Sequence, residues 1–487
     1  MATSARTPSQ TPVQGKPAET RTRVCYFLHG TGVGGASLSL LYLLQQMDRQ
    51  QYEPIVVCLF DSPMRERFQE LGVQTIVAQG MTYFSHTTGE ALSLRNPRGW
   101  LQVAMFLPSV WKTYRLVKEL KPSIVHANSS TLAPQVIGAK LASAKVVWHI
   151  REHVLDGVVG LRKALLRWIA RRYADALITI MEGEGQRLGV AHKTSLIYNF
   201  VDFTYFDRHL RDKAMAATPN RPKTVAMLGG VDKIKGTLEL AQASLLVNEK
   251  LGNVRFVVAG YGGDGASNGA FNPRRWLSLL LGHGRYARSI RLLCKPLDPR
   301  GPELAGVVQD VPSLLAQADL VVFPSTEPHF ARPLIEAGAM ALPVVASDIP
   351  GPRELVVLGK TGLLVPPGDV EALAAAITTI LSDDRLAKTM GEAGYEQARQ
   401  LFDARANAQA TFAVYEQVTH GATSSAANGG KHSEGLPSTP PRISVHPVLA
   451  SLFLLWLVAL FGMYVWNILQ VANRWDRIQE VLGRLLS

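Results

Sequence analysis

Two stretches of the chain combine residue types that suit the binding of a phosphate. Residues 25–36 read CYFLHGTGVGGA, an apolar run followed by a G-x-G-x-x-G pattern that begins at Gly30. Residues 323–340 read FPSTEPHFARPLIEAGAM, in which Pro333 suits the first turn of a helix, where its missing N–H would be unpaired anyway. Backbone N–H groups at glycine loops and at helix starts favour anions. Both stretches therefore predict contact with a phosphate-bearing ligand.

The glycine stretch leaves three interpretations open. It matches the dinucleotide fingerprint, with Asp61 after a later apolar run as a possible ribose ligand of NAD. It can instead serve another phosphate ligand, or it can be a strand-to-helix turn that holds no ligand. We favour the second interpretation, because groups suited to a diphosphate gather in the second half of the chain.

Those groups are Lys235, Arg332 and Glu336. Lys235 ends the run GGVDKIK, where its ammonium can reach a diphosphate as a point charge, although a solvated lysine at a helix start is the alternative. Arg332 can fork onto phosphate oxygens, and the free N–H groups of the helix turn that contains Arg332, Pro333 and Leu334 would face the same anion, although Pro333 itself has none. Glu336 lies one turn into the helix, where it can accept hydrogen bonds from a ribose diol, or merely cap its own helix.

The run His149-Ile-Arg-Glu-His153 matches H-x-x-E-H, a zinc-protease pattern. That pattern needs a helix, so that both histidines share one face. Here the residues KVVW lead straight into His149 and predict a strand that ends there. We therefore predict no metal site, and we interpret His149 as a polar contact to a sugar or as an ordinary loop histidine.

The elements that must position these residues alternate between short apolar runs and helical stretches. This alternation predicts two Rossmann-like, doubly wound parallel sheets that face each other across a cleft, over residues 23–210 and 221–418. The runs are continuously apolar, as in strands that are covered on both faces. Ligands bind beyond the C-terminal ends of such strands, where the glycine loop, His149 and Lys235 fall.

The two ends of the chain differ in composition. Residues 1–22 are polar, lack the apolar core of a signal peptide and predict a disordered arm. Residues 421–444 are a flexible linker rich in Ser, Gly and Pro. Residues 446–470 are apolar enough to predict a transmembrane helix, with a buried core helix as the alternative, and residues 471–487 form a short tail. We expect a single-pass C-terminal membrane anchor, with the rest of the chain on the cytoplasmic face.

The formal net charge of +12 implies an anionic partner. Nucleic acid is excluded, because the chain shows no platform of basic and aromatic residues and no groove-reading motif. Residues 161–173 carry five basic residues and no acidic one, and residues 100–120 are similar. Basic amphipathic helices can lie on anionic lipid, so we predict contact with a membrane surface; ordinary domain helices with a solvated basic face are the alternative.

Residues 22–418 resemble the retaining glycosyltransferases of the GT-B fold in family 4, which use nucleotide-sugar donors. The most specific part is residues 320–373, with PS-x-x-E, RPLIEA, LPVVASDIPG and TGLLVPPGD. The resemblance implies no metal and no cofactor. It also implies a set of site residues: Gly34 and Gly35 under the donor diphosphate and sugar, His149 at the donor sugar near the reaction centre, Lys235 at the diphosphate, and Glu336 at the ribose.

The chain departs from the family pattern at two places. The family has two glutamates separated by seven residues, whereas eight separate Glu327 from Glu336, which puts Pro328 at the first position and makes His329 the inserted residue. Glu327 can still reach the donor sugar through a rearranged loop. The family also has an arginine where this chain has Gly230.

The expected function is hexosyl transfer from a UDP- or GDP-linked sugar, with retention, to a lipid-linked or cell-envelope polysaccharide acceptor at the membrane. Two alternatives stay open. One is a membrane-anchored GT-B scaffold without catalysis, and the other is a sugar-nucleotide epimerase of the same architecture.

Overall fold

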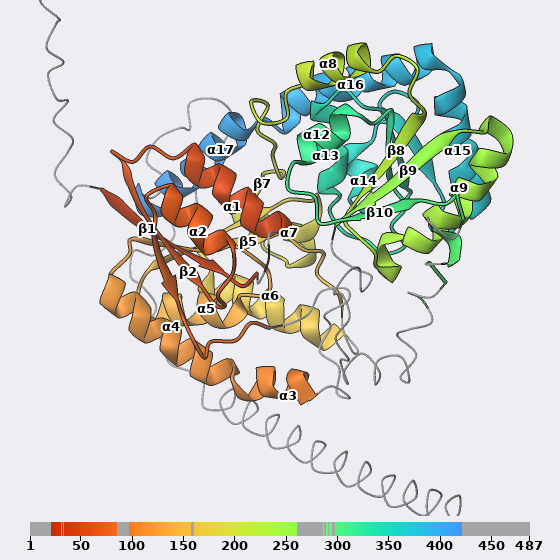
Figure 1. The fold of residues 1–487 in the computed structure, drawn as a ribbon. Coiled ribbons are helices and arrows are strands. Elements are labelled where there is room, and N and C mark those ends of the chain that lie inside the picture. The colour runs from red at the N-terminus through yellow and green to blue at the C-terminus, as the bar shows by residue number, and fades with distance from the viewer. Residues whose placement is uncertain are drawn as a thin grey trace, which may run out of the picture. The chain divides into compact units, whose positions relative to one another are not determined.

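The computed structural model describes residues 21–30, 32, 34–84, 97–156, 160–260, 286, 289, 290, 292–294 and 298–420. Helix α3 (Pro97–Ala104) belongs to the second of two compact units. All other described elements belong to one unit that contains two parallel sheets (Figure 1).

The first sheet has the strand order β3-β2-β1-β4-β5-β6-β7 within the described residues, with every pair parallel. Helices cover both of its faces, since α4, α5 and α6 contribute to one core and α1 and α17 to the other. The strands are β1 (Thr22–Leu28), β2 (Tyr52–Cys58), β3 (Gln74–Val77), β4 (Ile124–Ala127), β5 (Lys145–Ile150), β6 (Ala176–Thr179) and β7 (Thr194–Leu196). The helices are α1 (Gly35–Gln45), α2 (Met64–Glu70), α4 (Phe106–Leu120), α5 (Ala133–Leu141), α6 (Leu161–Tyr173) and α7 (Glu184–Arg187), with the 3-10 turn η3 (Ala191–Lys193).

The second sheet has the order β10-β9-β8-β11-β12-β13 and is also parallel. Helices α9 and α15 pack on one face, and α12, α13 and α16 on the other. The strands are β8 (Lys223–Leu228), β9 (Val254–Ala259), β10 (Glu303–Gly306), β11 (Leu320–Phe323), β12 (Val344–Ser347) and β13 (Gly362–Val365). The helices are α8 (His209–Ala217), α9 (Thr237–Leu251), α12 (Val311–Ala316), α13 (Arg332–Ala339), α14 (Pro352–Leu355), α15 (Val370–Ser382), α16 (Asp384–Leu401) and α17 (Ala404–His420), with the 3-10 turn η4 (Lys233–Lys235).

The predicted pair of doubly wound parallel sheets is confirmed. The apolar runs in the sequence correspond to the interior strands and to the edge strand β13, but they miss the other three edge strands, β3, β7 and β10. These three strands are partly exposed along their length, so they lack the continuous apolar run that marks a strand covered on both faces.

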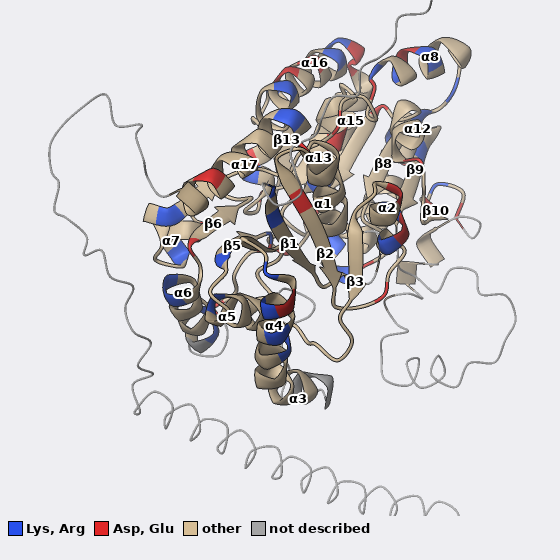
Figure 2. Cartoon of the chain, turned by 90° about the vertical axis from the view of Figure 1, so that its left-hand side faces the viewer, with Lys and Arg blue, Asp and Glu red and all other residues tan. Residues whose placement is uncertain are grey.

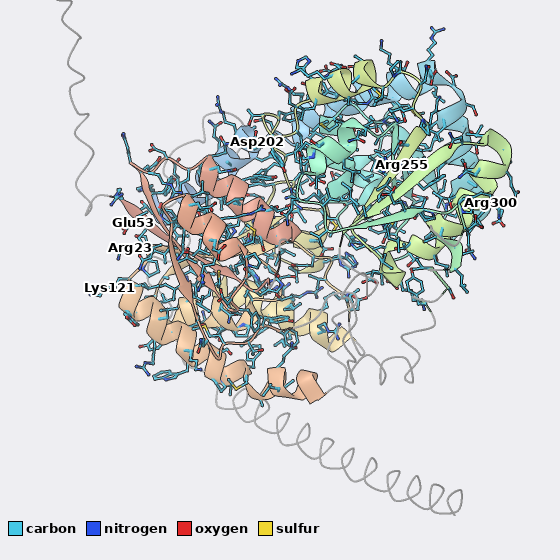
Figure 3. All side chains as sticks on the ribbon, in the orientation of Figure 1. Arg23, Glu53, Lys121, Asp202, Arg255 and Arg300 are labelled. Carbon is cyan, nitrogen blue, oxygen red and sulfur yellow. The ribbon has the colours of Figure 1, made fainter. Side chains whose placement is uncertain are left out.

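Ion pairs between neighbouring strands help to hold the strands of both sheets together. Arg23 on β1 meets Glu53 on β2, with 3.1 Å between Nε and Oε2 (Figure 3), and these two residues are direct register partners. Arg255 on β9 forms an ion pair with Glu303 on β10, with 2.9 Å between Nη2 and Oε2, although the register partner of Glu303 is Val257. Both pairs are partly exposed, so each contributes at most about 1 kcal/mol.

The last described helix, α17, returns to the first sheet. Its buried residues Ala408, Val414 and Tyr415 join the core that contains Tyr26 of β1 and Tyr52 of β2. A bridge between Val201 and Asp403 lies just before this helix. The core of the first sheet is therefore completed by a segment that follows the second sheet in the sequence.

The predicted C-terminal anchor 446–470, its linker 421–444, the tail 471–487 and most of the predicted arm 1–22 lie outside the described residues. Within the described part of the chain, none of the helices is both long and apolar enough to cross a membrane.

Candidate functional site

The glycine loop joins β1 to α1 and leaves the start of that helix open. The N-cap of α1 is Gly34, which offers no side-chain oxygen, and the first turn holds no acidic residue. A Cβ atom added at Gly34 would meet nothing within 4 Å, and one added at Gly35 would meet only Nε of Arg332, at 3.7 Å. The N–H groups of this turn are thus uncapped and approachable, as a phosphate site requires.

Helix α13 begins at Arg332, also without a side-chain cap or an acidic residue in its first turn. Arg332 is only 8% exposed, and its side chain reaches toward α1. Its Nη2 donates to the carbonyl oxygen of Gly35 at 3.4 Å and to Oγ of Ser39, and its Nη1 donates to the carbonyl oxygen of Phe200 at 3.4 Å. The predicted fork of Arg332 onto phosphate stays a prediction; in this structure the guanidinium links the starts of α13 and α1.

Glu336 lies one turn further along α13, beside that guanidinium. Its Oε1 is 3.8 Å from Nη1 of Arg332, and the residue is buried. Burial raises the pKa of the Glu336 carboxyl to about 7, and the nearby Arg332 charge opposes this shift. Burial therefore favours the protonated form of Glu336, and its predicted contact with a ribose stays a prediction.

Lys235 ends the turn η4 and points at the loop before α13. Its Nζ lies 2.6 Å from Nε2 of His329, and burial lowers the pKa of this ammonium to about 8. Nδ1 of His329 lies 2.9 Å from the carbonyl oxygen of Glu327, which can only accept, so Nδ1 carries the proton and Nε2 accepts from Lys235. The inserted residue His329 thus accepts a hydrogen bond from Lys235, the lysine that we predicted to bind a diphosphate.

The loop of residues 324–331 absorbs the inserted residue in a tight turn. The carbonyl oxygen of Glu327 accepts from Oγ of Ser325 at 3.1 Å as well as from His329. The Glu327 side chain is exposed. Its predicted catalytic contact with the donor sugar stays a prediction. No pattern in the sequence indicated that His329 would contact Lys235.

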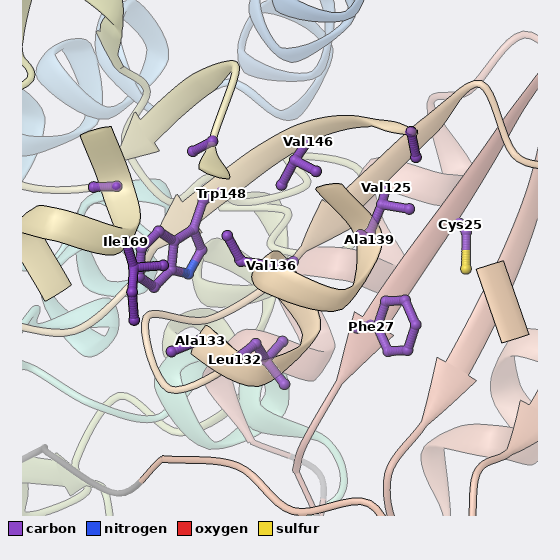
Figure 4. Close-up of a cluster of buried hydrophobic side chains, with 14 of the residues drawn as sticks. Cys25, Phe27, Val125, Leu132, Ala133, Val136, Ala139, Val146, Trp148 and Ile169 are labelled. Carbon is purple, nitrogen blue, oxygen red and sulfur yellow. The ribbon is translucent and has the colours of Figure 1, made fainter. Parts of the chain in front are cut away.

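His149 lies one residue before the end of β5, as expected, but it is buried rather than open to a cleft. Strand alternation sends the neighbouring Trp148 into the core on the other face, where it packs near Val136 and Ile169 (Figure 4). On its own face, His149 meets His126 of β4, with 3.1 Å between Nδ1 of His149 and Nε2 of His126.

The other residues of the H-x-x-E-H run are tied to neighbouring loops. Glu152 accepts hydrogen bonds from Oγ of Ser129 at 2.8 Å and from the backbone N–H of Ser130 at 2.9 Å. His153 pairs with Glu184, with 2.6 Å between Nδ1 and Oε1. Among the described residues, no group of three or more His, Cys, Asp or Glu is placed to hold a metal ion.

A second polar group, which the sequence analysis did not single out, lies next to His149. Arg151 is buried and donates to Oδ1 of Asn128 at 2.8 Å and to Oδ1 of Asn199 at 2.6 Å. The same Asn199 oxygen accepts from Oγ of Ser39, which in turn contacts Arg332. Residues 124–128 read IVHAN, and this run, which ends at Asn128, was the available signal. It could not reveal this group, because Asn199 lies far away in the sequence.

Both halves of the chain match glycosyltransferase family models. Residues 33–205 match the model described as Glycosyltransferase Family 4, and residues 211–397 match Glycosyl transferases group 1. The chain carries two glycosyltransferase domains.

Asp61, which the NAD interpretation required, forms an exposed ion pair with Arg65 at 3.4 Å.

Curated relatives of these glycosyltransferase domains include two kinds of enzyme. The D-inositol 3-phosphate glycosyltransferase of Corynebacterium efficiens is 31% identical over 211 residues, which cover 43% of this chain and 46% of that protein. The glycogen synthase of Mycobacterium tuberculosis is 37% identical over 109 residues, which cover 22% of this chain and 26% of that protein. The matches thus span less than half of each relative.

Solved structures share the fold of both glycosyltransferase domains. An Anabaena protein crystallised with UDP and glucose has a TM-score of 0.64 and 21% identity, covering 81% of this chain and all of that one. Sucrose-phosphate synthase from Thermosynechococcus elongatus has a TM-score of 0.60 and 21% identity, with 82% of this chain and 100% of that chain covered. The two parallel-sheet α/β domains are consistent with the GT-B fold.

Proposed function

We propose that this chain is a retaining, metal-independent glycosyltransferase that moves a hexosyl group from a UDP- or GDP-linked sugar to a lipid-linked or cell-envelope polysaccharide acceptor. One observation carries the proposal: the uncapped starts of α1 and α13 adjoin at the contact between Gly35 and Arg332. Each helix start carries partial positive charge, so the two together favour an anion. Lys235 adds an ammonium close by, through its contact with His329 three residues before Arg332.

The reaction breaks the bond between the anomeric carbon and the diphosphate oxygen, and it forms a bond from that carbon to the acceptor oxygen on the same face. Negative charge develops on the departing diphosphate, where Lys235 and the two helix starts stabilise it. Donors preorganised in this way are worth on the order of 3 kcal/mol each. The acceptor proton passes to the departing phosphate oxygen, so no protein base is assigned. Glu336 would bind the ribose, and His149 would contact the donor sugar.

Replacing the buried lysine tests the chemical part of the proposal. Lys235→Ala should lower turnover at least 100-fold, on the order of one lost electrostatic donor, while the fold is retained. The matched control is Lys250→Ala at the exposed end of α9. Donors are first found by calorimetry against UDP- and GDP-sugars, and the product anomer is read by NMR. Near-normal transfer by Lys235→Ala, or an inverted product, contradicts the proposal.

The membrane part of the proposal is supported by exposed apolar side chains on basic helices of the first domain. Trp111 on α4 and Trp168 on α6 are 60% and 43% exposed, and basic residues lie along both helices (Figure 2). Both helices contribute to the same core. With the apolar segment 446–470, they would hold the enzyme on the cytoplasmic face of an anionic membrane.

Vesicle experiments test this part separately from the chemistry. Removing residues 421–487 should lower activity on a polyprenyl-linked acceptor in anionic vesicles but not on a soluble acceptor analogue. Trp111→Ala with Trp168→Ala should weaken the residual sedimentation of that truncated chain with the vesicles. Unchanged activity on the lipid-linked acceptor after truncation contradicts a presenting role of the anchor.

A scaffold without catalysis is the second candidate, and the contact between His329 and Lys235 is the observation that favours it. A lysine held by a neighbouring side chain is less free to meet a diphosphate. Slow donor hydrolysis in the absence of any acceptor would support the transferase, whereas its absence together with absent donor binding would support the scaffold. Conversion of the donor into an isomeric nucleotide-sugar would instead indicate an epimerase.

A further inference from the structure

A chain of hydrogen bonds runs from the first sheet through the last helix to His149. The Tyr415 hydroxyl on α17 donates to Oη of Tyr26 on β1 at 3.1 Å. The same hydroxyl lies 2.6 Å from Nδ1 of His126, whose Nε2 lies 3.1 Å from Nδ1 of His149. The four side chains are buried, and three of them are fully buried. None of them exchanges protons freely with solvent, so the order of protons along the chain is set by the protein.

The direction of the first bond fixes every later one. With Tyr415 as the donor to Tyr26, its hydroxyl offers a lone pair to His126, and Nδ1 of His126 then carries a proton. Burial lowers the pKa of His126 to about 3, and burial together with the charge of Arg151 holds the pKa of His149 well below its usual range. Both rings are therefore neutral and carry one proton each. Nε2 of His126 is bare, and Nδ1 of His149 must donate to it.

The last atom of the chain is Nε2 of His149. It is buried and has no hydrogen-bond partner among the described residues. Nη2 of Arg151 and Nε of Arg332 are also buried without a hydrogen-bond partner among the described residues. Hydrogen bonds through Asn199 and Ser39 connect these two arginines. A buried acceptor without a partner costs about 1–3 kcal/mol, which is a cost that a ligand can relieve.

We propose that Tyr26, acting through Tyr415 and His126, is a positioning residue that holds His149 in the tautomer with a proton on Nδ1 and a bare, accepting Nε2. This inference rests on the proposed function for its ligand: the donor sugar presents a hydroxyl proton to that nitrogen. Since Nε2 is closed to solvent in this structure, binding of the hydroxyl is coupled to a local opening. A bare nitrogen also disfavours a sugar carboxylate at the same place, because two lone pairs would face each other.

The test reads the tautomers directly in the full chain labelled with nitrogen-15 at histidine. Long-range proton–nitrogen correlation spectra should show a protonated Nδ1 and a bare Nε2 on both His126 and His149. In Tyr26→Phe the Tyr415 proton has lost its acceptor and turns to Nδ1 of His126, so both histidines should change to the Nε2-protonated tautomer. Tyr52→Phe removes a neighbouring buried hydroxyl from the same core and should change neither.

An Nε2-protonated His149 in the unsubstituted chain overturns the proposal, and so does an unchanged tautomer in Tyr26→Phe. Should Tyr26→Phe fold poorly, Tyr415→Phe provides the second variant, and it should leave a mixture of tautomers at His126. The ligand is probed separately by adding UDP or UDP-glucose. UDP-glucose alone should shift the Nε2 resonance of His149. If neither compound binds, the proposed function fails while the tautomer result stands by itself.

Discussion

At the scale of single residues, the buried position of Lys235 against His329 should make ligand affinity depend on pH. Burial lowers the pKa of Lys235 to about 8, so its ammonium is charged below that pH and becomes neutral as the pH rises through it. Affinity for UDP, measured by calorimetry from pH 6.5 to 10, should therefore fall above about pH 8. His329→Ala should admit water beside Nζ, restore part of the lost solvation and move this fall to higher pH. An identical pH profile in His329→Ala would contradict the inferred role of that contact.

The buried carboxyl of Glu336 should make the free energy of unfolding depend on pH. Its pKa is raised from 4.5 to about 7, so the folded state binds more protons than the unfolded state between these values. Stability contributed by the group is present below about pH 4.5 and is lost as the pH rises to about 7. Glu336→Gln does not titrate. The melting temperature of the variant minus that of the unsubstituted chain should thus grow from pH 4.5 to 7 and level off above, and a constant difference would contradict the shift.

The identity of most candidate residues could be predicted from the sequence, but their partners could not. The sequence placed Arg332 at a helix start and Lys235 in a glycine turn, and both positions are correct. It could not place Gly35 against Arg332 or His329 against Lys235, because each contact joins segments that are far apart and depends on side-chain directions. The chain of hydrogen bonds from Tyr26 to His149 could not be predicted from the sequence either, because a buried tyrosine or histidine in an apolar run resembles any other core residue.

At the scale of elements, the turn that carries Lys235 depends on one glycine. Gly236 has φ +74, and a Cβ added there would lie 1.8 Å from the carbonyl oxygen of Pro324, at the end of β11. Gly183 begins α7 with φ +76, and a Cβ added there would meet nothing within 4 Å. Both alanine variants carry the strain of positive φ, but only Gly236→Ala must also push β11 and η4 apart.

Gly236→Ala should therefore lose about 1–3 kcal/mol more stability than Gly183→Ala in urea unfolding. It should also weaken UDP binding, because the shift moves Lys235 relative to the start of α13. Equal losses in the two variants would show that conformational strain alone, and not the contact with Pro324, decides the cost.

The sequence predicted elements best where burial was complete. Interior strands such as β1 and β11 have nearly unbroken apolar runs. The edge strand β10 is largely exposed and short, so no run marked it. A strand that is covered on both faces is marked by the apolar residues of its own sequence. A short, exposed edge strand such as β10 instead forms because it pairs with the neighbouring strand.

At the scale of the whole molecule, α17 makes the first core depend on the last described segment. Val414 is 3% exposed and packs in the core of the first sheet, whereas Gln409 lies on the exposed side of the same helix. Val414→Asp should bury an unpaired charge and speed amide hydrogen exchange in β1 and β2. Gln409→Asp is the control and should leave that exchange unchanged. Protection of β1 that survives Val414→Asp would contradict the dependence.

The return of α17 to the first sheet also means that the core of this sheet cannot be completed until the ribosome has made α17. His126 and Tyr415 are hydrogen-bonded but separated by 289 residues. At about 5–20 residues per second on the ribosome, that interval lasts roughly 15 to 60 seconds. Within that interval, once β7 has been made, the face of the first sheet that bears Tyr26 is complete in sequence but has no α17 to cover it. The nascent chain must be shielded for that time, and a ribosome that stalls before residue 404 should release a product that chaperones retain.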